Sequence, residues 1–136
     1  MTCDLERFVA AQAPVYEAVL TELRAGRKRS HWIWFVFPQI AGLGTSAMSQ
    51  RYAIRSRDEA EAYLAHPVLG PRLVGCTQLV LRTAGSAHDV FGDPDTAKVR
   101  SCMTLFAAVA GEGSVFATAL GRFFGGVGDG ETLRRI

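Results

Sequence analysis

Apolar residues recur at helical spacing along most of the chain, whereas the alternation typical of strands is scarce. The stretch 68–84 shows the helical pattern clearly, with apolar side chains at i, i+4, i+7 and i+11: Leu69, Leu73, Cys76 and Val80. The stretch 94–111 carries a second stripe, made of Val99, Cys102, Met103, Phe106 and Val109. Each stripe gives its helix one apolar face, so both helices are expected to pack against the core.

Capping residues and prolines indicate where the helices begin and end. Ser56 and Glu59 form an S-x-x-E capping box ahead of a helix at 57–65, and Asp93 followed by Pro94 predicts another helix start. The remaining expected starts are Asp4 for 4–12, Pro14 for 14–25, Pro67 for 68–84, Ser86 for a short turn at 87–92 and Ser114 for 115–126.

These patterns predict an all-α fold of six or seven helices in a single domain that spans residues 1–136. Tyr52 and Ile54 alternate with polar neighbours, so a short strand at 51–56 is expected as a minor β element. The sequence lacks the βαβ alternation of a nucleotide-binding sheet. It also lacks a glycine-rich phosphate loop, because GLGTSA has no strand before it and no lysine after it.

The segment 30–44, SHWIWFVFPQIAGLG, holds both tryptophans of the chain and one of its three histidines. Its apolar side chains do not sort onto one face by either the helical or the strand period, so both conformations stay open. In both, most of the segment belongs to the core. His31 and Gln39 are its polar ends, and a pocket can open at such ends.

Composition places the chain among ordinary globular proteins. Apolar residues make up 49% and charged residues 21% of its 136 positions, enough for one domain with its own core. No apolar run approaches the roughly 20 residues that span a bilayer, so we expect no membrane segment. The first residues lack the pattern of a secretory signal, and a cytoplasmic location is expected.

Cysteines and histidines are too few and too scattered to predict a metal site. Cys3, Cys76 and Cys102 form no C-x-x-C pair, which argues against a disulfide framework and against structural zinc. Neither a metal nor a cofactor is therefore expected. A net charge of +2 makes nucleic acid a less favoured partner without removing it.

A basic run precedes the aromatic segment: Arg24, Arg27, Lys28, Arg29 and His31. Cations in the last turn of a helix complement its dipole, which accounts for Arg24 and Arg27. Lys28 and Arg29 lie beyond that turn, where a phosphate or another small anionic ligand is the alternative explanation. Trp32 and Trp34 would then offer a stacking surface to a base, and His31 would be placed for proton transfer.

The stretch 91–101, FGDPDTAKVRS, is the second candidate site. Asp95 and Lys98 lie one helical turn apart near a helix start, whose free N–H groups attract anions. Helix capping and solvent exposure also explain these charges, so acid–base chemistry or phosphate binding by Asp95 or Lys98 is a hypothesis. Arg51 and Tyr52, which follow the GLG loop, are candidates for the same cavity.

Three motifs together resemble a known family. KRSHWIWFVFPQIAGLGTSAMSQRYAI, SRDEAEAYLAHPVLGPRL and FGDPDTAKVRSCMTLF occur in this order, and the likeness extends from DLERFVAAQ to the final FFGG. The sequence is similar to the small bacterial and fungal proteins of domain-of-unknown-function family 1810. This resemblance implies a single, mainly helical domain. It gives weight, without roles, to the polar residues of the family motifs: Lys28, His31, Trp32, Trp34, Gln39, Arg51, Tyr52 and Lys98.

Members of that family sometimes carry a calpastatin-like label, but such calpain inhibitors are disordered and repetitive, whereas this chain is apolar and unrepeated. Three functions stay open. The first is an enzyme or binding protein for a small phosphorylated ligand such as a nucleotide or ADP-ribose derivative. The others are a module that docks a partner through the aromatic segment, and a nucleic-acid-binding protein. The residues decide neither between catalysis and binding alone nor the oligomeric state.

Overall fold

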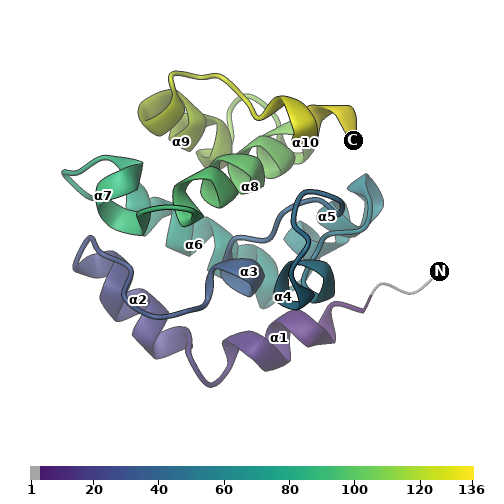
Figure 1. Cartoon of the computed structure of the whole chain (residues 1–136), viewed down its shortest axis with the longest axis horizontal. Coiled ribbons are helices and arrows are strands. Elements are labelled where there is room, and N and C mark those ends of the chain that lie inside the picture. The colour runs from purple at the N-terminus through teal and green to yellow at the C-terminus, as the bar shows by residue number, and fades with distance from the viewer. Residues whose placement is uncertain (1–3) are drawn as a thin grey trace.

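The computed structural model describes residues 4–136, and within them the chain forms ten helices and no strand (Figure 1). In chain order these are α1 Glu6–Gln12, α2 Tyr16–Arg24, α3 Ile33–Val36, α4 Ala47–Arg51, α5 Arg57–Ala65, α6 Leu69–Leu81, α7 Ala87–Phe91, α8 Asp95–Ala110, α9 Val115–Phe124 and α10 Gly130–Arg134. The mainly helical single domain is therefore confirmed. Among the described residues, no helix combines the length and hydrophobicity needed to cross a membrane.

The expected number of six or seven helices is wrong, because residues 4–136 hold ten. The aromatic segment contains α3, and the stretch after the GLG loop contains α4, neither of which the apolar pattern predicts. A helix of four or five residues completes little more than one turn, so apolar positions cannot repeat within it and show a period. The equally short α7 is predicted by the sequence only as a turn.

The strand expected at 51–56 is replaced by the end of α4 and one isolated bridge. Ile54 pairs in parallel with Ile40. The Ile54 N–H donates to the Gln39 carbonyl and the Ala41 N–H donates to the Ile54 carbonyl, both at 2.8 Å. Tyr52 and both isoleucines are buried, so the alternation reflects the docking of an irregular segment onto the core. The bridge also fixes the point at which the loop before α4 leaves the core.

Serine caps are confirmed at α5, α7 and α9, where the hydroxyls of Ser56, Ser86 and Ser114 accept hydrogen bonds from backbone N–H groups. The reciprocal half of the box at Ser56 differs from the prediction. The Glu59 carboxylate accepts from the N–H of Arg55, at 3.1 Å, instead of from the N–H of Ser56.

The helix caps expected from Asp4 and Asp93 are wrong. Helix α1 begins after Leu5 and α8 begins after Pro94, and neither residue supplies a side-chain cap. Asp93 turns its carboxylate towards His88, whose Nε2 lies 3.2 Å from Oδ2. That carboxylate therefore pairs with α7 across the surface and does not cap α8.

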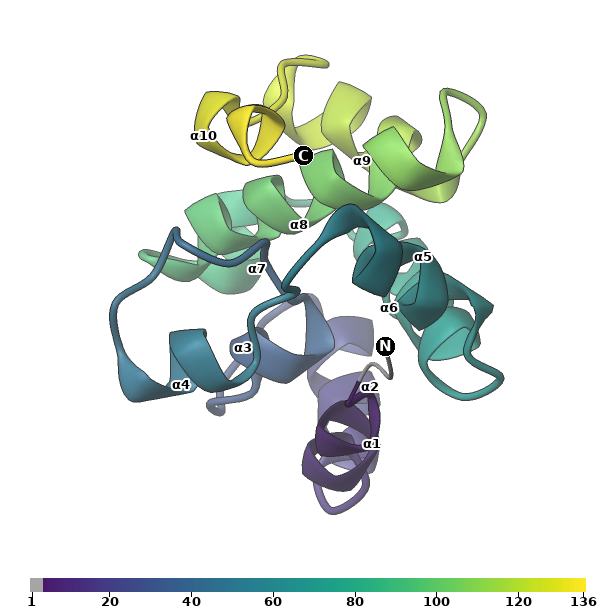
Figure 2. The same ribbon diagram turned by 90° about the vertical axis from the view of Figure 1, so that its right-hand side faces the viewer.

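Helix α8 lies in the middle of the molecule, with α9 and α10 on one side and α3 and α6 on the other (Figures 1 and 2). Its buried face runs from Val99 to Phe106, which confirms most of the predicted stripe. The first turn of α8 reaches past this core towards two loops, the one between α2 and α3 and the one between α3 and α4. The candidate site forms where these segments meet.

Candidate functional site

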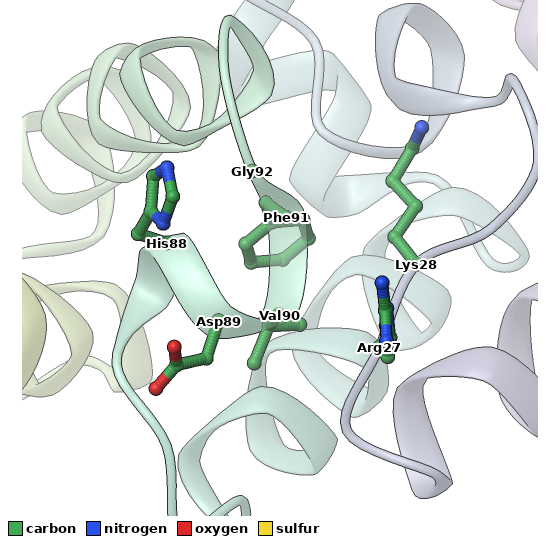
Figure 3. A pocket seen from close by; sticks show the side chains of 7 residues that line it. All are labelled: Arg27, Lys28, His88, Asp89, Val90, Phe91 and Gly92. Carbon is green, nitrogen blue, oxygen red and sulfur yellow. The ribbon is translucent and has the colours of Figure 1, made fainter.

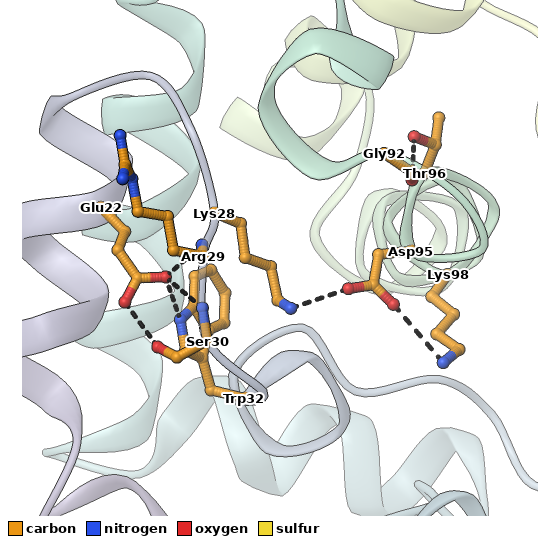
Figure 4. A network of polar contacts seen from close by, with 9 residues as sticks. All are labelled: Glu22, Lys28, Arg29, Ser30, Trp32, Gly92, Asp95, Thr96 and Lys98. Carbon is orange, nitrogen blue, oxygen red and sulfur yellow. Dashed lines mark hydrogen bonds and ion pairs between the residues drawn. The ribbon is translucent and has the colours of Figure 1, made fainter.

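Lys28 and Lys98, the two lysines of the chain, both contact Asp95 (Figure 4). Nζ of Lys28 lies 2.8 Å from Oδ2 of Asp95, and Nζ of Lys98 lies 3.5 Å from Oδ1. Lys28 belongs to the loop after α2, whereas Asp95 and Lys98 occupy the first turn of α8. Asp95 and Lys98 lie one helical turn apart, as their spacing in the sequence indicates, and Lys28 joins them. We call these three residues the lysine cluster.

Each lysine of the cluster lies over a tryptophan ring. Nζ of Lys28 is 5.2 Å from the ring centroid of Trp32, and Nζ of Lys98 is 5.2 Å from that of Trp34. Such cation–π contacts contribute roughly 0.5–2 kcal/mol each, the higher value applying where water is excluded. Trp32 directly precedes α3 and Trp34 lies within it. The aromatic segment therefore supports the cluster.

The lysine cluster is largely removed from water and carries more positive than negative charge. The side chains of Lys28, Asp95 and Lys98 are 7%, 15% and 22% exposed. One carboxylate faces two ammonium groups, and the start of α8 adds the partial positive charge of a helix N-terminus. Excess charge that is poorly solvated is costly unless it is paired. The cluster is therefore expected to attract an anion.

Glu22 on α2 holds the loop that carries Lys28 (Figure 4). Its Oε1 accepts from the N–H of Arg29 at 2.6 Å, the N–H of Ser30 at 2.8 Å and Nε1 of Trp32 at 3.1 Å, and Oε2 accepts from the Ser30 hydroxyl at 2.5 Å. Burial alone would raise the pKa of the Glu22 carboxyl, but these bonds outweigh it and lower the pKa to about 2. Ionised Glu22 therefore fixes both the loop and the indole beneath Lys28.

Lys28 also lines a hollow of about 580 Å³ between this loop and α7 (Figure 3). The walls include the side chains of Arg27, Lys28, His88 and Asp89 together with residues 90–92. The N–H of Lys28 donates to the carbonyl of Val90 at 2.7 Å, which ties the loop to α7. We call this cavity the basic hollow, because its wall holds an arginine and a lysine.

Lys98 faces a second hollow, of about 350 Å³, between the loop before α4, the first turns of α8 and the start of α10. Gln39 lines it from the loop, and Asp129 and Glu131 line it from the α10 side. We call it the mixed hollow, because its wall holds charged groups of both signs. Asp95 thus contacts one lysine from each hollow.

Most of the predicted site residues come together: the lysine cluster, the two tryptophans beneath it, and Gln39 in the mixed hollow. The other three, His31, Arg51 and Tyr52, line neither hollow. His31 is exposed. The Arg51 guanidinium lies 5.4 Å from the ring centroid of Tyr52, and that ring packs against Phe35 in the core.

Burial separates the two tryptophans. Trp32 is 1% exposed, so its ring supports Lys28 from within the core and is closed to a ligand in this conformation. Trp34 is half-buried and packs against the edge of the core. The stacking role predicted for both rings is therefore open only to Trp34.

Glu22 and His88 lie at the site without having been predicted there. Glu22 resembles any other carboxylate on a helix, and its partners lie seven to ten residues later, outside helical spacing. His88 reaches the basic hollow only through the docking of α7. The sequence does carry one signal that points to the cluster, because lysine is rare: the chain has two lysines among 15 basic residues. In the structure, both lysines pair with the carboxylate of Asp95.

The described residues were expected to hold neither a metal site nor a disulfide framework. No group of three histidine, cysteine, aspartate or glutamate side chains is placed to hold a metal ion among residues 4–136. Cys76 and Cys102 are buried, as their stripe positions predict. Burial raises the pKa of the Cys76 thiol to about 11 and that of Cys102 well above its usual value. Cys3 lies outside the described residues.

Comparisons with known proteins place the chain in a family. The model of a family described as protein of unknown function (DUF1810) matches residues 2–136. The crystal structure of the conserved hypothetical protein Rv1873 from Mycobacterium tuberculosis is similar to this chain at 53% sequence identity and a TM-score of 0.93. The match covers 96% of this chain and 94% of that one. A comparison with curated proteins finds none that matches.

Proposed function

The chain belongs to this family of proteins of unknown function, DUF1810, and we propose that it binds a small phosphorylated ligand with the phosphate in the basic hollow. The observation that carries the proposal is the excess positive charge of the lysine cluster, which borders this hollow through Lys28. The Asp89 carboxylate in the same wall already accepts from the N–H of Ser86 at 2.9 Å. A cavity of about 580 Å³ also has the size of a small-molecule site.

Three groups are available to a phosphate in the basic hollow. Lys28 has three N–H donors and uses one on Asp95, so two remain. Arg27 is exposed beside it, and a guanidinium binds phosphate oxygens in pairs. His88 lies across the hollow (Figure 3), and an imidazole ring carries a nitrogen that can donate a hydrogen bond.

The other two lysine-cluster residues support this contact without touching the phosphate. Asp95 holds Lys28 in place, and Lys98 shares the same carboxylate, so neither ammonium is fully neutralised. His31, Arg51 and Tyr52 are not included in the proposed site, because they line neither hollow.

Burial of the aromatic segment speaks against the docking alternative. Trp32 and Phe37 are each 1% exposed, and Val127 and Leu133 are the exposed large apolar side chains among the described residues. Apolar patches that bind proteins usually exceed a few hundred Å² of contiguous surface. The aromatic segment presents little such surface, which favours the phosphorylated ligand.

Thermal-shift and calorimetric titrations with inorganic phosphate, pyrophosphate, AMP and ADP-ribose test the proposal. A ligand at 100 times its Kd adds about 2.7 kcal/mol to the stability of the native state. We expect at least one of these compounds to raise Tm in a saturable way. Screening of the charges should weaken the effect as ionic strength increases.

Arg27→Gln is expected to weaken that binding by about ten-fold, or 1.4 kcal/mol. The Tm of the free protein should not change, because Arg27 is exposed. Arg29→Gln is the matched control, since Arg29 is an exposed arginine of the same loop and lies outside the basic hollow. Equal losses in the two variants, or no response to any of the four compounds at millimolar concentration, would refute the proposal.

A further inference from the structure

The mixed hollow holds opposite charges that do not touch the phosphate in the proposed site. Lys98 supplies the cation from α8, and Asp129 and Glu131 supply carboxylates from the α10 side. Burial opposes ionisation of Asp129, but hydrogen bonds from Thr132 lower the pKa of its carboxyl, and a hydrogen bond from Arg135 lowers the pKa of Glu131. Both carboxylates are therefore ionised at neutral pH.

These charged groups keep capacity for a ligand. Asp95 engages one of the three N–H donors of Lys98, at 3.5 Å. A carboxylate offers about four lone-pair sites, of which Asp129 uses two on the N–H and hydroxyl of Thr132. The carboxylate of Glu131 contacts one arginine through each oxygen. Each of the two carboxylates can therefore accept one more hydrogen bond.

The walls of the mixed hollow are held in place from outside the cavity. The N–H of Asp129 donates to Oγ1 of Thr104 on α8 at 2.9 Å. Arg135 rests against Gly42 in the opposite loop, where an added Cβ would lie 2.9 Å from Nε. With its φ of +98°, Gly42 occupies a conformation that favours glycine. These contacts thus hold the loop and the segment around Asp129 in place before any ligand enters.

Apolar side chains complete the wall. Leu43 lines the hollow from the loop, and Pro94 and Ala97 line it from the start of α8. The two carboxylates would repel a simple anion, and Lys98 and Arg100 in the same wall would repel a simple cation. A molecule that carries both charges and an apolar group meets neither penalty.

We infer that the mixed hollow binds a zwitterionic amino acid with an apolar side chain. Its carboxylate pairs with Lys98, and its ammonium pairs with Asp129 and Glu131. Its side chain lies against Leu43 and Ala97. A volume of about 350 Å³ lies within the usual range for a small-ligand site. This site lies in a different hollow from the proposed phosphate site, and the two share only the Asp95 carboxylate, which contacts both lysines.

Three compounds with one side chain test this inference by their charge. L-Leucine is a zwitterion, N-acetyl-L-leucine is an anion and L-leucinamide is a cation. We expect NMR titrations of ¹⁵N-labelled protein to show saturable shifts of the amide signals of Ala97 and Lys98 with L-leucine. The other two compounds should bind at least about ten-fold more weakly, because each loses one charged contact.

Lys98→Gln and Glu131→Gln are each expected to weaken L-leucine binding by about ten-fold. Asp95 stays paired with Lys28 in the first variant, and Glu131 is exposed, so both variants should keep the fold. Glu112→Gln is the matched control, since this exposed carboxylate lies between α8 and α9 and outside the hollow.

Equal affinity for L-leucine and N-acetyl-L-leucine would reduce the site to an anion contact at Lys98 and overturn the inference. An unaltered affinity in Glu131→Gln would do the same, as would the absence of saturable shifts with L-leucine in the unmodified protein. The phosphate proposal is tested with the Arg27→Gln variant, whose substituted residue lies in the other hollow. Either proposal can therefore fail while the other stands.

Discussion

Single carboxylates order the candidate site through bonds that reach beyond their own helices. Asp95 joins the loop after α2 to α8 by pairing with Lys28 as well as Lys98. Glu22 closes the same loop from the other side with four hydrogen bonds. Bonds to an ionised acceptor are about twice as strong as neutral ones. The position of the loop therefore depends on the negative charge of Glu22 as well as on the shape of its side chain.

Glu22→Gln is expected to lower the free energy of unfolding by about 1–2 kcal/mol at pH 7. The pKa of Glu22 is about 2 in the folded state against 4.5 for a free carboxyl. Its stabilisation is therefore complete above pH 4.5 and is lost as the pH falls towards 2. Urea unfolding from pH 2 to pH 7 should show the two proteins converging at the acid end.

Glu17→Gln is the matched control for this prediction, because Glu17 is an exposed carboxylate on the same helix. Its substitution should change stability by less than about 0.5 kcal/mol. A constant difference between Glu22→Gln and the unmodified protein at all pH values would show that the charge of Glu22 contributes nothing.

Among the elements, the corner between α5 and α6 shows how closely two helices approach. Nδ1 of His66 accepts from the N–H groups of Val68 and Leu69, at 3.1 and 3.2 Å, and so binds the start of α6. Gly70 then lies directly against the end of α5, where an added Cβ would collide with the carbonyl oxygen of Leu64. The atoms nearest to the added Cβ are all backbone atoms of Leu64, so no flexible side chain can move aside to make room.

Gly70→Ala is expected to destabilise the protein by about 1–3 kcal/mol, because the new methyl group forces two helices apart. Gly121→Ala is the opposite case in α9, where an added Cβ meets nothing within 4 Å. That substitution should stabilise the protein by about 0.5–1 kcal/mol through helix propensity. Denaturant unfolding of both variants checks the pair, and a neutral Gly70→Ala would contradict the close approach.

Across the whole molecule, Arg7 links α1 to distant parts of the chain. Its guanidinium donates to Oε1 of Glu59 at 2.9 Å, to the Ala53 carbonyl at 2.8 Å and to the Arg51 carbonyl at 2.9 Å. The Arg7 and Glu59 side chains are only 7% and 4% exposed. The contacts of Arg7 therefore connect α1 with α5 and with the irregular segment that follows α4.

Arg7→Met is expected to cost about 3 kcal/mol, because it leaves the Glu59 carboxylate buried without its cation. The double variant Arg7→Met with Glu59→Met should recover at least about 1 kcal/mol of that loss, since no buried charge remains. Thermal and urea unfolding measure both. A double variant less stable than the sum of the two single changes would contradict this account.

Local spacing in the sequence was sufficient for most of the larger helices and for part of the site. The helix at 57–65, the serine caps and the buried stripes follow from neighbours within a few residues of each other. The approach of Asp95 and Lys98 follows from their separation by one turn. Hydrogen bonds within a helix and the burial of one face act over such short distances, so sequence reasoning reaches them.

Tertiary packing alone decided how Lys28 reaches Asp95 and which polar residues share a hollow. The loop after α2 is positioned by Glu22 and by the carbonyl of Val90, contacts between segments far apart in the chain. The same packing formed the short helix α3 within the aromatic segment and left His31 outside both hollows. Contacts of this kind depend on how whole helices dock, which no local pattern of residues specifies.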